Sequence, residues 1–170
     1  MRPTQQHRII LGIDPGLAHT GWGVISQRGS KLSCVAYGCI ETPASQSLPD
    51  RLGKIYSQIA AVVARYNPSC VSIETVWFGS NTTTAFATGQ ARGAALAACA
   101  GLVESFAEYT PKQIKLAIVG TGAADKEQVE YMVQHLLQLE AKPQPDHAAD
   151  ALAACCAAAV SLSVSGGSNR

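Results

Sequence analysis

Two acidic residues each end a short apolar segment, and this placement is the strongest chemical signal in the sequence. Asp14 follows the apolar residues 9–13, and Glu74 follows residues 70–73. Burying an unpaired carboxylate is costly, so acids at the ends of buried strands suit a metal ligand, a phosphate-site organiser or a catalytic base. If the two strands are parallel neighbours, both acids emerge at the carboxyl edge of the sheet, where α/β proteins place their chemistry.

A further group of polar residues opens the last predicted helix, at Asp146, His147 and Asp150. Residues three or four positions apart share a helix face, so both His147 and Asp146 can act together with Asp150. Asp150 is surrounded by alanines that predict burial, and a buried aspartate needs a partner. Mg²⁺ prefers such oxygen-rich sites. Two Mg²⁺ ions about 4 Å apart would activate water and stabilise the leaving oxygen of a phosphodiester.

Each of these residues also has a purely structural interpretation. Asp14 can form a turn with the following Pro-Gly, and Glu74 can be a solvated strand end. Asp146 follows a proline and is most simply a helix N-cap, which we favour over metal ligation. His147 in the first helical turn can be an ordinary surface residue. The metal interpretation therefore depends on the convergence of several residues rather than on any single one.

The elements that must position these residues alternate between strands and helices. Short apolar or alternating segments predict strands, and a 3.6-residue apolar period predicts helices. The predicted strands are residues 9–14, 20–26, 31–41, 70–74 and 104–109. The predicted helices are residues 48–66, 82–100, 111–119, 125–139 and 146–162. This order predicts an α/β fold with a five-stranded mixed sheet flanked by helices. We expect a single domain over residues 1–162 and a flexible Ser/Gly-rich tail over residues 163–170.

The composition excludes several classes of protein. The chain has 170 residues, 47% of them hydrophobic and 15% charged, which is typical of a compact globular protein. No run of 18 apolar residues predicts a membrane span, and the segment before the first strand lacks a signal-peptide core. We therefore expect a cytoplasmic protein. The six cysteines have neither C-x-x-C nor zinc-ligand spacing and are expected to be free thiols.

Basic residues are few but grouped. The net charge is only +1, so a nucleic-acid surface must come from local clustering. Lys112 and Lys115 share one face of a short helix, although they can also be merely solvated. Asn81 and the threonines after it open a helix whose N-terminus suits a phosphate. The other grouped basic residues are Arg92 and Lys126.

Six motifs that occur in order along the chain resemble those of one known family. They are I-I-L-G-I-D-P-G, T-G-W-G-V-I, I-E-T-V-W, G-Q-A-R-G, P-K-Q-I-K and D-H-A-A-D-A-L-A. Together they resemble the RuvC family of bacterial Holliday-junction resolvases, which have a ribonuclease-H-like fold, over residues 8–159. The resemblance implies a homodimeric endonuclease of DNA recombination and repair. Such an enzyme cuts two opposed strands of a four-way DNA junction, uses Mg²⁺ or Mn²⁺, and acts beside a branch-migration complex.

The resemblance also implies roles for individual acids. Asp14 and Glu74 match the first two catalytic acids of the family, and Asp150 matches the fourth. In much of the family the last helix begins Asp-x-x-Asp, so His147 occupies the position of the third acid. Asp146 is the alternative ligand. An imidazole lowers the negative charge of the site and suits Mn²⁺ better than Mg²⁺.

The resemblance also implies which residues contact DNA. Trp77 matches an aromatic that the family places against bases near the crossing point, where stacking is worth roughly 1–3 kcal/mol. Lys115 and Lys126 match residues near the scissile backbone. We predict further DNA contacts for Asn81, Arg92 and Lys112. The small-residue helix over residues 82–100 is the expected dimer face.

Three other functions are compatible with the residues taken alone. A ribonuclease-H-like nuclease that acts on other nucleic-acid intermediates is the nearest, because acids do not specify the substrate. A non-catalytic junction-binding protein would explain His147 as a decayed metal site. An actin-like kinase is disfavoured, because the chain has no G-x-x-x-x-G-K-[ST] loop and holds only half of a two-lobed kinase.

Overall fold

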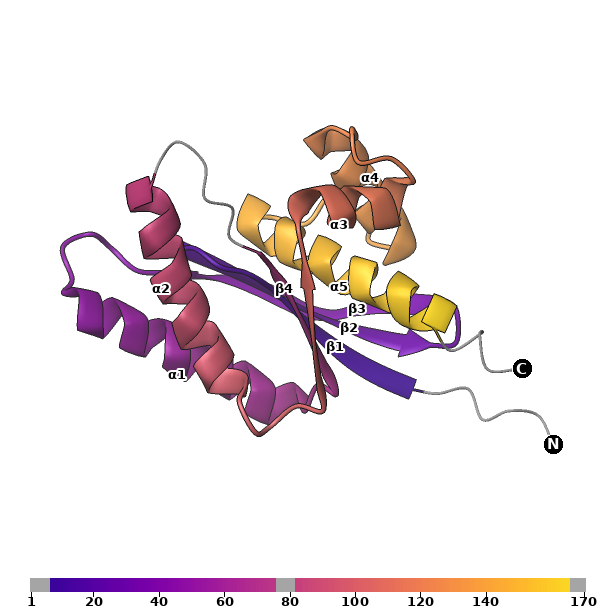
Figure 1. Ribbon diagram of the computed structural model, residues 1–170. Coiled ribbons are helices and arrows are strands. Elements are labelled where there is room, and N and C mark those ends of the chain that lie inside the picture. The colour runs from indigo at the N-terminus through magenta and orange to yellow at the C-terminus, as the bar shows by residue number, and fades with distance from the viewer. Residues whose placement is uncertain (1–6, 76–81, 166–170) are drawn as a thin grey trace.

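The computed structural model describes residues 7–75 and 82–165. Its strands are β1 (His7–Asp14), β2 (His19–Arg28), β3 (Lys31–Glu41), β4 (Cys70–Glu74) and β5 (Ser105–Tyr109). Its helices are α1 (Leu48–Tyr66), α2 (Thr82–Cys99), α3 (Pro111–Val119), α4 (Lys126–Leu136) and α5 (Asp146–Ser165). The strands form one sheet in the order β3-β2-β1-β4-β5 with helices on both faces (Figure 1). The predicted five-stranded mixed sheet is confirmed.

The central strand, β1, is covered on both faces. Ile10 packs into the core beneath α5, whereas Ile13 packs into the core beneath α1 and α2. This double burial explains why the segment is apolar throughout rather than alternating. β1 pairs in parallel with β4, and Ile13 lies opposite Ile73. The next residues, Asp14 and Glu74, therefore leave the sheet at the same edge, as predicted.

Helices α1 and α2 cover one face of the sheet, and α5 lies across the other beneath α3 and α4 (Figure 1). Local signals fix the ends of α1. The Ser47 side chain accepts a hydrogen bond from the backbone N–H of Asp50, and Asn67 ends the helix with a φ of 46°. The predicted helix over residues 48–66 is confirmed.

Glycines let α5 approach the sheet until the backbones nearly touch. A Cβ on Gly12 would lie 2.0 Å from the carbonyl oxygen of Ala151, and a Cβ on Gly21 would lie 1.8 Å from that of His147. The hydroxyl of Ser72 also donates a 2.7 Å hydrogen bond to a carbonyl oxygen of α5. These contacts set the position of the first turns of α5 relative to the end of β1.

The ends of three helices differ from the predictions. α2 ends at Cys99, one residue before the predicted end. α4 follows the capping residue Asp125 and ends at Leu136, three residues before the predicted end. It stops there because Gln138 adopts a left-handed backbone conformation with a φ of 54°. α5 continues to Ser165, three residues into the predicted tail, and residues 166–170 lie outside the described residues.

Two expectations from composition concern cysteines and membranes. All six cysteines are free thiols, and four of them are buried, which confirms the prediction. Among residues 7–75 and 82–165, no helix is long and apolar enough to cross a membrane.

Candidate metal centre

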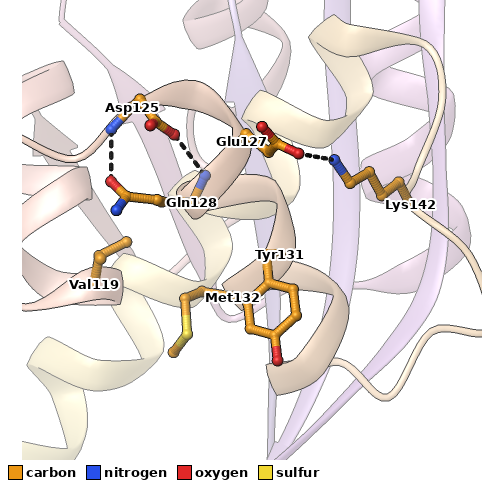
Figure 2. Close-up of a pocket in the computed structure, with 7 residues that line it drawn as sticks. All are labelled: Val119, Asp125, Glu127, Gln128, Tyr131, Met132 and Lys142. Carbon is orange, nitrogen blue, oxygen red and sulfur yellow. Dashed lines mark hydrogen bonds and ion pairs between the residues drawn. The ribbon is translucent and has the colours of Figure 1, made fainter.

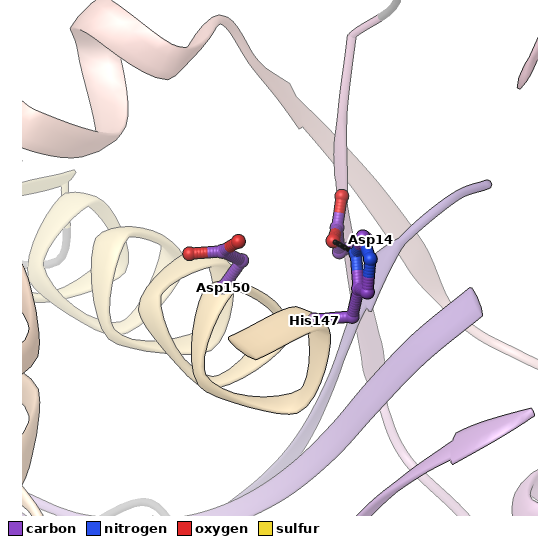
Figure 3. A group of neighbouring side chains, drawn as sticks. All are labelled: Asp14, His147 and Asp150. Carbon is purple, nitrogen blue, oxygen red and sulfur yellow. Dashed lines mark hydrogen bonds and ion pairs between the residues drawn. The ribbon is translucent and has the colours of Figure 1, made fainter. Parts of the chain in front are cut away.

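Three of the four predicted ligands converge at the carboxyl edge of the sheet. Asp14 ends β1, and His147 and Asp150 lie in the first turns of α5 (Figure 3). One donor atom from each residue lies within 4.8 Å of the other two. Nδ1 of His147 lies 2.8 Å from Oδ2 of Asp14. Neighbouring ligands of one Mg²⁺ are about 3 Å apart, so this donor set fits a divalent cation.

Glu74 lies outside this tight group but lines the pocket beside it. The pocket has a volume of about 250 Å³, and its charged lining residues are Glu74, Asp150, Lys115 and Lys126. Burial raises the pKa of Glu74 to about 7, and the negative charges of Asp14 and Asp150 contribute to the shift. A carboxylate that carries such a penalty is stabilised by a nearby cation.

The pKa values of the other two acids are raised as well. Burial raises the pKa of Asp14, while the hydrogen bond from His147 opposes that shift. Burial also raises the pKa of Asp150, and the charge of Asp14 adds to the effect. Three neighbouring acids whose pKa values are all raised fit a candidate cation site, because a bound cation would stabilise their charged forms.

Replacing Glu74 with Gln is expected to stabilise the metal-free protein at pH 8. The folded-state pKa of about 7 lies above the ordinary value of 4.5, so the folded protein loses stability as Glu74 ionises between those pH values. After allowance for partial solvent exposure, removal of this charge is worth about 1–2 kcal/mol, or roughly 3–6 °C in Tm. Thermal unfolding in EDTA measures the shift.

The same comparison at pH 5 is the control. There Glu74 is protonated in the folded protein, so the two Tm values should nearly coincide. Added Mn²⁺ should raise the Tm of the wild type more than that of the Glu74→Gln variant, because ligands that bind the folded state stabilise it. A lower Tm for the variant in EDTA at pH 8 would contradict this account of the acids.

Asp146 does not cap α5, so the favoured N-cap interpretation is wrong. It lies within the first turn, and its Oδ2 accepts a 2.8 Å hydrogen bond from Nζ of Lys126. This hydrogen bond lowers the pKa of the exposed Asp146 carboxyl. Nζ of Lys126 also lies 3.7 Å from Asp150. The Asp146 carboxylate therefore binds Lys126 on α4 and does not cap its own helix, although the local sequence predicts that it does.

Only some of the predicted DNA contacts lie near the acids in the structure. Trp77 and Asn81 lie outside the described residues. Arg92 forms a 2.7 Å ion pair with Glu108 on β5. The side chain of the exposed Lys112 extends over Gly122, where a Cβ would lie only 2.6 Å from it. Of the predicted basic residues, Lys115 and Lys126 are the two that line the pocket.

Two residues of the site were missed by the sequence predictions. The ring of His19 stacks on that of His147, and Gly21 leaves the space into which the His147 carbonyl fits. The available signal was their spacing, because residues two apart on a strand share a face. That signal identifies the face of β2 but not the helix that packs on it.

A larger pocket of about 370 Å³ lies beside α4 (Figure 2). Its lining includes Tyr131 and Met132, together with Glu127 and Lys142, whose charged atoms are 3.9 Å apart. None of the predicted metal ligands lines it. The smaller pocket beside the acids is therefore the candidate active site.

Comparison with known proteins gives one consistent result. The family model described as "Crossover junction endodeoxyribonuclease RuvC" matches residues 10–158. A protein of that name from Heliobacterium modesticaldum is 49% identical over 151 residues, which cover 88% of this chain and 93% of the relative. Another from Hyphomonas neptunium is 49% identical over 150 residues, covering 88% of this chain and 89% of the relative.

Solved structures agree with the sequence comparison. T. thermophilus RuvC in complex with a Holliday junction substrate is 34% identical, with a TM-score of 0.88 over 93% of this chain and 96% of that one. The yeast mitochondrial Holliday junction resolvase Ydc2 is 13% identical, with a TM-score of 0.59 over 97% of this chain and 85% of that one, and shows a shared fold alone. The expected ribonuclease-H-like fold is confirmed.

Proposed function

We propose the following function because this chain belongs to the RuvC family of crossover junction endodeoxyribonucleases. The protein cleaves two opposed strands of a four-way DNA junction by metal-dependent phosphodiester hydrolysis, in recombination and repair. The observation that carries the proposal is the convergence of Asp14, His147 and Asp150, with donor atoms within 4.8 Å of one another. These donors can hold a divalent cation, which supports the phosphodiester cleavage that the name endodeoxyribonuclease describes.

The proposed ligands come from three different elements. Asp14 and Glu74 contribute carboxylates from adjacent strands, and His147 and Asp150 contribute an imidazole and a carboxylate from α5. When bound, Mg²⁺ or Mn²⁺ supplies the Lewis acidity that lowers the pKa of water and stabilises charge on the departing 3′ oxygen. Ligands on regular strands and a helix hold the reacting groups more rigidly than ligands on loops would.

The lysines of the pocket bind the substrate backbone in this proposal. Lys115 and Lys126 face the space beside the acids and offset the phosphate charge that approaches them. Asp146 keeps Lys126 in place through its 2.8 Å ion pair, so we assign Asp146 an orienting role rather than a place among the ligands. Lys112, Arg92, Asn81 and Trp77 remain proposed DNA contacts.

A homodimer provides the second active site that two opposed cuts require. The proposed dimer face is α2, whose small residues permit close packing and whose Phe86 is 66% exposed. Contact with a branch-migration complex is proposed from the family alone. Two Mg²⁺ ions per active site are the proposed cofactor, and Mn²⁺ is the expected substitute.

The His147 donor gives this site a testable metal preference. A His147→Asp variant restores a fourth carboxylate, which favours the harder Mg²⁺ over Mn²⁺. The ratio of the Mn²⁺-supported to the Mg²⁺-supported cleavage rate is expected to fall by roughly tenfold, or ~1.4 kcal/mol in relative stabilisation. Single-turnover cleavage of a synthetic four-way junction, with each metal in turn, measures this ratio.

The matched control is His135→Asp, a change to an exposed histidine on α4. It should leave the metal ratio at the wild-type value. An unchanged ratio in His147→Asp, with cleavage retained, would remove His147 from the proposed ligand set.

A further inference from the structure

The ring of His19 lies flat against the ring of His147. Their centroids are 5.4 Å apart and their planes differ by 4°, which is an offset-stacked arrangement. We propose that His19 is a positioning residue that holds the His147 imidazole in its metal-binding orientation. This inference depends on the proposed metal centre and names a residue that supports it from outside the ligand set.

One face of β2 contacts both the backbone and the ring of His147. His19 and Gly21 are two residues apart on the strand and therefore point to the same face. Gly21 leaves room for the carbonyl of His147, while His19 contacts its ring. Gly21 also lies opposite Asp14 in the antiparallel pairing with β1. The pair of strands that carries the Asp14 carboxylate thus also sets the position of the imidazole.

The backbone around His19 is itself held in place. The hydroxyl of the fully buried Thr20 donates a 2.7 Å hydrogen bond to the carbonyl of Gly16. The backbone N–H of Thr42 donates a 2.9 Å hydrogen bond to the carbonyl of Ala18. The backbone is thus fixed on both sides of His19, and this fixes the point from which its exposed ring extends towards His147.

The stack adds to the hydrogen bond that orients the His147 ring. A metal-binding histidine is usually oriented by a hydrogen bond from the ring nitrogen that does not face the metal. Nδ1 of His147 faces Asp14, and within residues 7–75 and 82–165 its Nε2 has no hydrogen-bond partner. The His147 side chain is also 44% exposed, so its ring has few packing contacts to fix it. The contact with His19 is therefore a second restraint on ring rotation, beside the 2.8 Å hydrogen bond between Nδ1 and Asp14.

Two substitutions separate stacking from other roles of His19. His19→Ala removes the ring, whereas His19→Phe keeps a flat ring without nitrogens. In DNA-free protein, the Kd for Mn²⁺ is expected to rise about tenfold in His19→Ala, because loss of a residue that supports a metal ligand typically weakens binding by that much. In His19→Phe the Kd is expected to stay within about threefold of the wild-type value. Electron paramagnetic resonance of unbound Mn²⁺ measures both values. His135→Ala, which removes an exposed ring that lies against Tyr131, is the matched control and should not change the Kd.

Two results of the Mn²⁺-binding measurements would overturn the proposed role of His19. Wild-type Mn²⁺ affinity in His19→Ala would overturn the proposal. Equal loss in His19→Phe and His19→Ala, with both proteins folded by circular dichroism, would also overturn it, because the nitrogens rather than the ring face would then matter. Asp14→Asn measured in parallel tests the metal centre itself. Loss of Mn²⁺ binding in Asp14→Asn without loss in His19→Ala would reject only the role of His19.

Discussion

Replacing Asp14 with Asn is expected to lower the junction cleavage rate by at least about 10³-fold, or ~4 kcal/mol, because the proposed central ligand loses its charge. Asn has nearly the same shape, so the packing at the end of β1 should survive. The carboxylate is also the partner of His147 at 2.8 Å, so its loss affects two proposed ligands at once. Single-turnover cleavage at saturating protein measures the effect on chemistry rather than on binding.

Junction binding should separate from cleavage in this variant. Asp14→Asn removes a negative charge near the DNA backbone, so affinity for the junction in EDTA should be unchanged or slightly tighter. The matched control is Asp50→Asn in the exposed first turn of α1, which should cleave at the wild-type rate. Cleavage by Asp14→Asn at a near wild-type rate would show that the acid is not a ligand.

Replacing Gly21 with Ala is expected to have the second largest effect on cleavage, although Gly21 carries no chemistry. The new Cβ would lie 1.8 Å from the carbonyl oxygen and 2.3 Å from the carbonyl carbon of His147, so the start of α5 must move. Overpacking of this kind costs about 1–3 kcal/mol of stability. A displacement of about 1 Å at the ligands lowers the rate by roughly 10²-fold.

Gly53→Ala is the control for this substitution. Gly53 is exposed on α1, and a Cβ there meets nothing within 4 Å. That change should leave cleavage intact and raise stability by up to ~1 kcal/mol, because Ala favours a helix more than Gly. Equal cleavage rates for Gly21→Ala and wild type would refute the close contact between β2 and α5. Chemical denaturation and single-turnover cleavage together supply the comparison.

The sequence predicts the elements well because local signals and burial agree over most of the chain. The helix over residues 48–66 has a capping serine, a regular apolar period and a terminal Asn67, and its observed bounds are the predicted ones. β1 and β4 are apolar because they are covered on both faces, and their terminal acids follow from the parallel pairing. The predicted end of α4 is wrong because Leu137 and Leu139 continue the apolar period after the helix has ended at Leu136.

The site is less predictable because its geometry depends on contacts between distant segments. The sequence identifies Asp14, His147 and Asp150 as candidates, and the fold brings their donor atoms together. It misassigns Asp146, since the competing partner Lys126 comes from a different helix. It overlooks His19, because nothing near that residue in the sequence indicates which ring will lie against it.

We propose above that Asp14, Glu74, His147 and Asp150 together form an active site for cutting four-way DNA. The most direct test incubates the wild-type protein with a synthetic junction whose branch point can migrate through varied sequence, so that a base preference does not mask activity. A linear duplex of the same sequence is the control substrate, and EDTA the control for metal. We expect paired nicks in two opposed strands with Mg²⁺ or Mn²⁺, and no cleavage of the duplex or in EDTA. Binding without any cleavage, or equal cleavage of junction and duplex, would contradict it.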